Sequence, residues 1–403
     1  MVRSRSADGS PTDHRPSCVQ AREDFPVNHP GAGGRCGGHP RPIRFPPMMD
    51  AVELLQRLVE LESPTGDRER MGHIGRFIAA ELEALGARIE PRDPHLIARL
   101  GPDDGPALVL MAHMDTVWPA GTLPKMPFRV QDGYAHGPGA LDMKAGIVTG
   151  LEALRRLGGL RRPVHFLVTA DEEIGSPSGR PLVEELAKGA RAALVLEPPV
   201  KDGTITTTRS GLARYQLHIR GRAAHAGNGA RAGISAVDEL AHQIMAVHRM
   251  ADPAAGIRTN VGQVGGGTGD NVVAAEAWAR IDGRAWTADG QRTLEQAIRG
   301  LRPHNTGATI EVSGGVTRPP MVQTAAAAEL VRSAIAIAKD AGVNLAENAS
   351  PGGSDGNFAA AVGTPVIDGL GPTGSGAHAV DERVSIESLG ERISLLSALL
   401  VSL

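Results

Sequence analysis

Apolar residues recur with two different periods along the chain, and these periods predict where helices and strands lie. From residue 49 the apolar positions follow helical spacing, and a second helical stretch covers residues 67–86. Short apolar runs predict four buried strands: Leu96 to Leu100, Ala107 to Met111, Val164 to Val168 and Ala192 to Leu196. Helical stretches such as residues 145–157 separate these runs. Strands that alternate with helices predict an α/β sheet.

The pattern changes after about residue 208. The next elements follow the order β-α-β-β-α-β, which is that of a ferredoxin-like unit: strands near 212–219, 257–264, 272–283 and 308–313, with helices near 234–245 and 289–302. The chain then returns to an alanine-rich helix at 323–341 and a terminal amphipathic helix at 385–402. We therefore predict an α/β domain in two parts, residues 48–208 and 315–403, interrupted by a ferredoxin-like domain at residues 209–314.

Residues 1–47 follow neither period. They are rich in Pro, Gly, Arg, Ser and Asp, so we predict a disordered extension. Met48 and Met49 directly precede the first helical stretch, and a natural start at this point is the alternative explanation. The two cysteines, Cys18 and Cys36, both lie in the extension, which excludes a disulfide framework or a cysteine zinc site from the rest of the chain.

The charge balance limits the partners. The chain has 403 residues, 42 of them Lys or Arg and 45 Asp or Glu, for a formal net charge of −3. This balance gives no electrostatic footprint for nucleic acid or an anionic membrane. No apolar run approaches the roughly 18 residues of a spanning helix, and the N-terminus lacks the apolar core of a secretory signal. We therefore expect a cytoplasmic protein whose partner is a small molecule.

A histidine and an aspartate directly follow the predicted strand at 107–111. Functional groups of open α/β sheets gather at the carboxyl ends of strands, so His113 is placed to project into a cleft. Asp115 is then able to accept the other ring N–H and to orient the imidazole for a metal. A purely structural histidine–aspartate pair is the alternative.

Four further potential ligands lie at strand ends or in glycine-rich loops: Asp142, Glu173, Glu197 and His378. The three consecutive carboxylates at 171–173 repel one another and are costly to desolvate unless cations neutralise them. A solvated acidic turn is the alternative for this stretch. A turn with an N-capping aspartate is the alternative for Asp142.

Together with His113, these residues form a set of five nitrogen and carboxylate ligands. Such ligands suit zinc, with cobalt or manganese as substitutes. Five ligands are too many for one catalytic zinc and fit two zinc ions that share one carboxylate, about 3.5–4 Å apart. This assignment leaves Glu172 free to act as a general base.

The motifs match a known family in order and spacing. They are HxDTV at 113–117, GxGxxDMKxG at 137–146, DEExGS at 171–176, the Glu-Pro pair at 197 and the late His378. As a set, over residues 49–403, they resemble the two-zinc peptidases and deacylases, the family of glutamate carboxypeptidase, acetylornithine deacetylase and succinyl-diaminopimelate desuccinylase. The resemblance implies a catalytic domain with a mixed sheet flanked by helices, and an inserted ferredoxin-like domain that serves as lid and dimer interface.

The resemblance also implies how the ligands are shared. Asp142 would bridge two zinc ions, with His113 and Glu197 on one ion and Glu173 and His378 on the other. Asp115 would orient His113, and Glu172 would move a proton from the attacking water to the leaving nitrogen. A cis peptide bond after Asp142 is implied as well.

Substrate contacts are implied for the inserted domain and for one loop. His225 would stabilise the oxyanion, often across a homodimer formed through residues 209–314; a surface turn is the alternative. Asn271, Arg284 and Arg318 would contact substrate, and an arginine fork matches a free carboxylate. Structural salt bridges are the alternative for the two arginines. The loop at 352–357, with Gly353 and Ser354, would line the pocket with backbone amides; a capped helix N-terminus is the alternative.

These roles predict zinc-dependent hydrolysis of an amide bond in a C-terminal peptide or an N-acyl amino acid. Glu197, Arg284 and the segment at 317–320 look most like the glutamate carboxypeptidase branch. An N-acetyl amino acid deacylase of the acetylornithine type and a dipeptidase are the alternatives within the family. A ligand-binding or dimerisation protein without catalysis is the alternative from another class.

Overall fold

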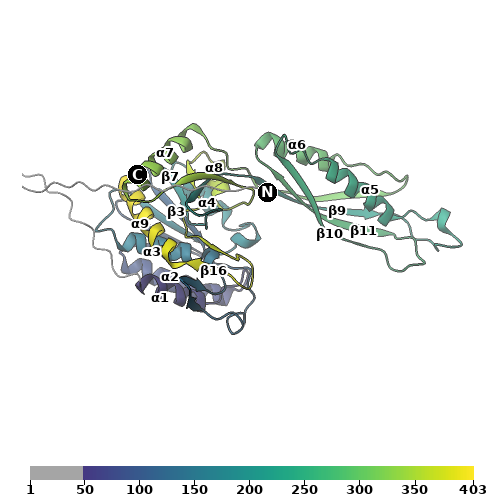
Figure 1. The fold of residues 1–403 in the computed structure, drawn as a ribbon. Helices are drawn as coiled ribbons and strands as arrows, with labels where there is room; N and C mark the ends of the chain where they lie inside the picture. The colour runs from purple at the N-terminus through teal and green to yellow at the C-terminus, as the bar shows by residue number, and fades with distance from the viewer. Residues whose placement is uncertain (1–48) are drawn as a thin grey trace, which may run out of the picture. The chain divides into compact units, whose positions relative to one another are not determined.

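The computed structural model describes residues 49–403 (Figure 1). The predicted extension, both cysteines and the alternative start at Met48 lie outside the described residues. None of the described helices is long and apolar enough to cross a membrane. Location in the cytoplasm stays a prediction.

The first sheet has six strands in the order β1-β2-β6-β3-β7-β14. Its strands are β1 (Arg88–Arg92), β2 (His95–Leu100), β3 (Leu108–His113), β6 (Val164–Thr169), β7 (Ala192–Val195) and β14 (Val366–Ile367). β6, β3, β7 and β14 run parallel to their neighbours in this set, whereas β1 and β2 are antiparallel to each other and β2 is antiparallel to β6. The predicted mixed sheet is thus confirmed, with β1 as an additional edge strand.

Alternate side chains of the central strands enter two different cores. Leu108 and Leu110 of β3 belong to one core, and Val109 and Met111 belong to the other. The helices that contribute side chains to the first core are α1 (Met49–Glu60), α2 (Arg68–Ala84), α3 (Ala145–Arg155), α7 (Ala325–Asp340) and α9 (Ile386–Ser402). Those of the second are α4 (Arg180–Ala187) and α8 (Gly356–Ala361). Helices on both faces explain why these strands are apolar throughout.

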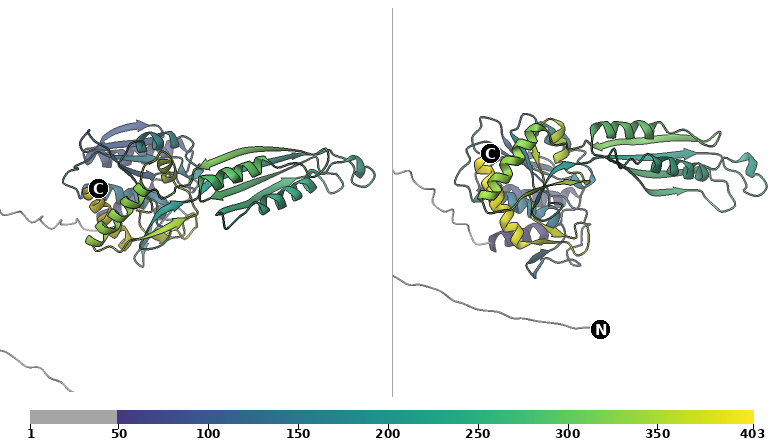
Figure 2. Two further views of the ribbon diagram at one scale, coloured as in Figure 1. Left: turned by 90° about the horizontal axis from the view of Figure 1, so that it is seen from above. Right: turned by 45° about the horizontal axis from the view of Figure 1, so that its top comes forward.

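The inserted segment forms a separate antiparallel sheet in the order β10-β11-β9-β12. Its elements are β9 (Gly211–Arg220), α5 (Ala236–Arg249), β10 (Ile257–Gly266), β11 (Glu276–Ala285), α6 (Ala288–Arg299) and β12 (Thr309–Arg318). Ala213, Tyr215, Leu217 and Ile219 of β9 are buried under the two helices, and the residues between them are more exposed. Both helices lie along one face of this sheet (Figure 2). This order confirms the ferredoxin-like fold, and β12 extends four residues beyond the predicted boundary at 314.

Two small sheets complete the described chain. One pairs β8 (Thr204–Arg209) with β13 (Ala346–Ser350) in parallel. The other has the order β15-β16-β5-β4, with β15 (Gly374–Ser375), β16 (Arg383–Ser385), β5 (Tyr134–His136) and β4 (Arg129–Gln131). Pairing of β5 with β16 brings the loop after residue 136 next to the segment before residue 383.

Gly146 allows α3 to pack directly on the end of β7. A Cβ atom at this position would lie 2.2 Å from the Leu196 carbonyl oxygen and 2.8 Å from the Met143 Cε. We predict that Gly146→Ala lowers the free energy of unfolding by about 1–3 kcal/mol, the usual cost of overpacking. Gly158→Ala, where a Cβ meets nothing within 4 Å, is the control. Urea denaturation measures both, and equal stability of the two variants would contradict the packing argument.

Candidate metal centre

Three neighbouring parallel strands bring acidic and imidazole side chains to one edge of the first sheet. His113 is the last residue of β3, Glu172 and Glu173 lie in η2 (Glu172–Ile174) after β6, and Glu197 follows β7. β3 pairs with both β6 and β7 in parallel. Because the carboxyl ends of parallel strands meet at the same edge, four groups from distant parts of the chain converge there.

Two loops add the remaining predicted ligands. Asp142 lies in η1 (Ala140–Lys144), where its backbone angles are not helical. The implied cis peptide bond between Asp142 and Met143 is present. His378 lies between β15 and β16 with a φ of 63°, in the left-handed region. The sequence reasoning named both residues, and the small sheet explains how their loops come together.

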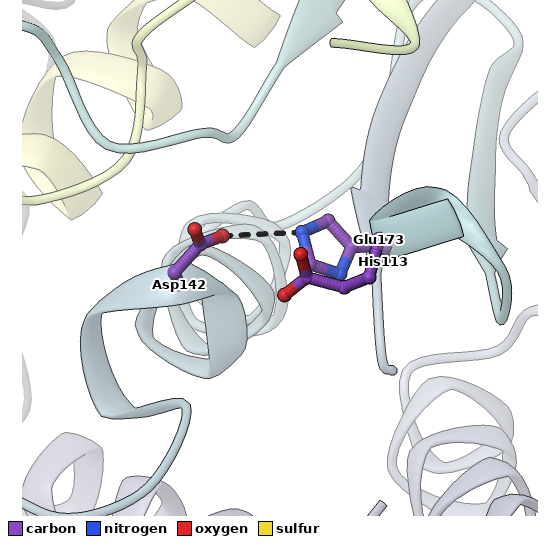
Figure 3. A group of neighbouring side chains, drawn as sticks. All are labelled: His113, Asp142 and Glu173. Atoms are coloured by element: carbon purple, nitrogen blue, oxygen red, sulfur yellow. Dashed lines mark hydrogen bonds and ion pairs between the residues drawn. The ribbon is translucent and has the colours of Figure 1, made fainter. Parts of the chain in front are cut away.

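The Asp142 carboxylate lies between the two histidines. His113 Nε2 is 3.2 Å from Asp142 Oδ1 and 3.6 Å from Glu197 Oε1. His378 Nε2 is 3.2 Å from Asp142 Oδ2 and 3.3 Å from Glu173 Oε2. Figure 3 shows the Asp142 carboxylate directed at the His113 ring, with Glu173 beside it. One carboxylate oxygen for each histidine is the arrangement needed for a bridging ligand between two metal ions.

The ligand atoms are close enough to surround a cation. Ligand atoms of His113, Asp142 and Glu173 lie within 4.8 Å of one another, and so do those of His113, Glu172 and Glu197. The second group contains Glu172, which the sequence reasoning assigned as the base. Its role as the base stays a prediction, and its carboxylate is also paired with Arg318.

Both imidazoles are surrounded by carboxylates. Burial lowers the pKa of His113, but hydrogen bonds to Asp115 and Asp142 outweigh it and raise the pKa well above its usual value. Hydrogen bonds to Asp142 and Glu173 raise the pKa of His378 to about 10. The surrounding carboxylates therefore favour a positive charge at the positions of both imidazole rings.

The acidic groups exceed the basic ones and are largely buried. Burial and the nearby Asp142 carboxylate raise the pKa of Glu197 well above its usual value. Burial also raises the pKa of Glu172 to about 7, although Arg318 opposes this shift. Glu173 Oε1 is buried without a hydrogen-bond partner. An orphaned carboxylate oxygen in an acidic cluster is what a bound cation would satisfy, so the residues fit a metal site.

Asp115 connects the histidine ligand to the acidic turn. Its carboxylate is fully buried, accepts a hydrogen bond from Thr65 Oγ1 at 2.8 Å, and lies 3.3 Å from His113 Nδ1. The backbone N–H groups of Glu172 and Glu173 also donate to it, both at 3.2 Å. Asp115 thus orients the imidazole and fixes the turn that carries the predicted base and a predicted ligand.

Arg318, the last residue of β12, contacts the predicted base. It is only 3% exposed, and its Nη2 lies 2.8 Å from Glu172 Oε1. Its Nη1 donates to Asp355 Oδ1 at 2.9 Å. Asp355 also accepts hydrogen bonds from Thr169 and Ser176. In this structure the Arg318 fork is engaged by protein carboxylates, and its role in substrate binding stays a prediction.

The other predicted substrate residues occupy two places. Arg284 Nη1 donates to the Pro351 carbonyl oxygen at 2.7 Å, at the start of the loop that contains Gly353 and Ser354. Ser354 is buried, and its hydroxyl donates to Asp368. Arg284 also pairs with Asp282, which is the structural salt bridge given as the alternative to substrate contact, and its role in substrate binding stays a prediction.

His225 and Asn271 lie together in the inserted domain, outside the ligand cluster. The Ala226 N–H donates to the Asn271 carbonyl oxygen at 2.8 Å, and His225 is exposed. The His225 Nδ1 accepts from the N–H groups of Gly227 and Asn228. The structure therefore joins the five predicted ligands with Asp115, Glu172 and Arg318, but it does not bring His225 to them within the described part of one chain.

Two residues of the site were missed by the sequence reasoning. Thr65 lies between the first two predicted helical stretches, where no candidate residue was named. Asp355 lies in the glycine-rich loop that was singled out, but its contact with Arg318 depends on β12 reaching it. The resemblance to the family marked this loop, whereas no local signal marked Thr65.

Comparison with known proteins identifies the same protein family that the sequence motifs resemble. The model for Peptidase family M20/M25/M40 matches residues 109–402. Carboxypeptidase G2 of Pseudomonas sp. (strain RS-16) is 32% identical over 370 aligned positions, and the match covers 87% of this chain and 89% of that protein. Succinyl-diaminopimelate desuccinylase of Thioalkalivibrio sulfidiphilus is 30% identical over 377 aligned positions, and the match covers 85% of this chain and 96% of that protein.

Solved structures show the same fold. Aminopeptidase PepT from Bacillus cereus superposes with a TM-score of 0.71 at 24% identity, over 88% of this chain and 98% of that one. A dinuclear metal-binding peptidase of this family from Bacillus subtilis has a TM-score of 0.62 at 18% identity, over 88% and 97% of the two chains. The chain therefore belongs to peptidase family M20/M25/M40 and is a metal-dependent hydrolase of amide bonds.

Proposed function

We propose that this enzyme is a zinc-dependent carboxypeptidase that releases a C-terminal amino acid from a peptide or an N-acyl amino acid, most like a glutamate carboxypeptidase. The observation that carries the proposal is the Asp142 carboxylate held between two histidines, with Glu172 beside His113. Similarity to carboxypeptidase G2 over 87% of the chain supports the branch.

The ligand set suits two zinc ions, with cobalt or manganese as substitutes. We assign His113 and Glu197 to one ion, Glu173 and His378 to the other, and Asp142 to both. Two bound ions would supply Lewis acid chemistry, which activates a water and polarises the amide carbonyl.

Glu172 is the group that moves the proton. It takes a proton from the attacking water as the amide carbon becomes tetrahedral, and it returns this proton to the leaving nitrogen. Asp115 holds the backbone of Glu172, and Arg318 holds the carboxylate, so the base is fixed at both ends. A fixed base needs no reorganisation at the moment of proton transfer.

Substrate recognition is assigned to the loop at 352–357 and to the inserted domain. Arg284, next to this loop at Pro351, is the candidate for the free carboxylate of the substrate, with Asn271, Gly353 and Ser354 as further contacts. Arg318, which is more deeply buried than Arg284, is a further candidate for binding the substrate carboxylate.

We also propose a homodimer through residues 209–314, in which His225 of each chain serves the site of the other. His225 is exposed and outside the ligand cluster of its own chain. Val237 and Met245, on the outer face of α5, are 45% and 58% exposed, and Val264 of β10 is 55% exposed. Exposed apolar side chains on one helix and one edge strand of the sheet support an interface there.

A desuccinylase or another N-acyl amino acid deacylase is the second candidate. Succinyl-diaminopimelate desuccinylase is 30% identical over nearly its whole length. The two reactions use the same base and ligands, and only the preferred acyl group and amino acid separate them.

We predict that the metal-stripped chain binds two Zn²⁺ ions and that Asp142→Asn weakens binding of both. A bridging ligand contacts two ions, so its loss costs at least the roughly 10–100-fold in affinity that follows loss of an outer-shell partner. Isothermal titration calorimetry measures the two sites. Asp104→Asn, in an exposed loop, is the control. Loss of only one ion in Asp142→Asn would contradict the bridging role.

We predict that the zinc-loaded enzyme releases glutamate from N-acyl glutamates faster than it cleaves N-acetyl or N-succinyl amino acids or dipeptides. Glu172→Gln is expected to lower kcat by about 10²–10⁴-fold, the usual contribution of a general base, and to keep both metal ions. Glu185→Gln, on the exposed side of α4, is the control. Preferred cleavage of acetyl or succinyl amides would favour a deacylase, and absence of zinc-dependent turnover on every substrate would contradict the proposed function.

We predict that Arg318→Gln moves the acidic limb of the pH profile of kcat/KM to higher pH. The Arg318 charge lowers the pKa of Glu172 against the effect of burial. Without it the carboxyl keeps its proton to higher pH, and the base acts only as the carboxylate. Arg318→Lys keeps the positive charge, so a smaller shift is expected. An unchanged acidic limb in Arg318→Gln would show that Glu172 does not control it.

A further inference from the structure

Glu382 is a buried carboxylate that has no role in the chemistry described so far. It lies four residues after His378, directly before β16, and is 1% exposed. Its side chain accepts four hydrogen bonds, all from N–H donors. Oε2 accepts from the Trp118 indole at 2.8 Å and the Gly139 backbone at 2.9 Å, and Oε1 accepts from the backbones of Leu141 at 2.9 Å and Asp142 at 3.1 Å.

The four donors belong to segments that carry predicted metal ligands. Trp118 follows His113 and Asp115 along the chain, while the three backbone donors form the loop of Asp142. Glu382 itself lies in the segment of His378, and its backbone N–H donates to the Ala379 carbonyl oxygen in the turn next to this histidine at 3.0 Å. A single carboxylate therefore ties together three ligand-bearing segments.

The loop around Asp142 depends on this carboxylate for its hydrogen bonds. Gly139 has a left-handed φ of 71°, and the angles of Asp142 and Met143 are not helical. N–H groups in such a turn have no regular helical acceptor, and leaving a buried one without a partner costs about 1–3 kcal/mol. Two N–H donors on each oxygen of Glu382 satisfy the donors of the loop and the buried carboxylate at once. Hydrogen bonds to an ionised acceptor are stronger than those to a neutral one.

We propose that Glu382 is a positioning residue that holds Asp142 and His378 at the spacing that lets one aspartate serve two metal ions. The proposal rests on the two-metal site of the proposed function. Glu382 does not touch the ions or the substrate. It acts through the backbone of Asp142 and through the loop of His378.

Glu382→Gln tests the proposal with little change in shape. A glutamine has one carbonyl oxygen and one NH₂ group, so an NH₂ group faces two N–H donors that now lack an acceptor. The metal-stripped full chain is titrated with Zn²⁺ by calorimetry and with Co²⁺ by visible absorption, without substrate. We expect Zn²⁺ affinity to fall by about 10–100-fold, as after other losses of an outer-shell partner, with a changed Co²⁺ spectrum. With substrate we expect kcat to fall and KM to stay the same.

Glu391→Gln, on the exposed side of α9, is the matched control and is expected to behave as wild type. Thermal unfolding of the metal-free proteins shows whether each variant is folded. A folded Glu382→Gln variant with wild-type Zn²⁺ affinity and an unchanged Co²⁺ spectrum would overturn the proposal.

Trp118→Phe decides the matter if Glu382→Gln does not fold. This variant removes one of the four donors and leaves the carboxylate in place. Weaker Zn²⁺ binding with an altered Co²⁺ spectrum would support the positioning role, and wild-type values for both would overturn it. Because binding is measured without substrate, absence of amide hydrolysis in wild type leaves this result intact. A wild type that binds no metal would refute the metal site itself, which is a different outcome from equal binding by variant and wild type.

Discussion

The structure depends on one electrostatic constraint, which is the gathering of four carboxylates at the edge of the central sheet. Asp142, Glu172, Glu173 and Glu197 converge on two imidazoles, and burial of so many like charges is unfavourable unless cations neutralise them. The raised pKa values of His113 and His378 express the same excess of negative charge. Arg318 offsets part of this charge through its ion pair with Glu172.

Two buried carboxylates hold the backbone of the acidic turn and of the Asp142 loop. Asp115 accepts hydrogen bonds from the backbone N–H groups of the acidic turn, and Glu382 accepts hydrogen bonds from those of the Asp142 loop. Both are buried carboxylates whose partners are mainly N–H donors. They add further negative charge near the site, yet each restricts the backbone conformation of the predicted site residues whose N–H groups it binds. Residues outside the predicted ligand set thus hold the backbone that carries Asp142, Glu172 and Glu173.

The five candidate ligands could be singled out from the sequence because each follows a strong local signal. His113, Glu173 and Glu197 come just after buried apolar strands, and glycines mark the loops of Asp142 and His378. Thr65 and Glu382 carry no such signal. The contact of Glu382 with Gly139 spans 243 residues, and only the pairing of β5 with β16 brings the two segments together.

The apolar pattern predicted the elements that have a strong local period and missed those that do not. The central strands and the inserted ferredoxin-like unit have clear periods, whereas β1 is polar and half exposed, and β4 and β5 have three residues each. β8 reads Thr-Ile-Thr-Thr-Thr-Arg and is largely buried, but threonine is not counted as apolar. It pairs with β13, which lies about 140 residues later, and a local period does not reveal such a long-range pairing.

The connections between the first sheet and the inserted sheet are themselves part of the site. Arg209 ends β8 just before β9, and its guanidinium pairs with the buried Asp368, which also accepts the hydroxyl of Ser354 in the predicted substrate loop. Arg318 ends β12 and pairs with Glu172. Removing one partner of a buried ion pair costs about 3–5 kcal/mol, because the other charge is left uncompensated. Both connections are therefore anchored by arginine–carboxylate pairs, one beside the predicted substrate loop and one on the predicted base, so a displacement at either connection directly changes the contacts of Ser354 or Glu172.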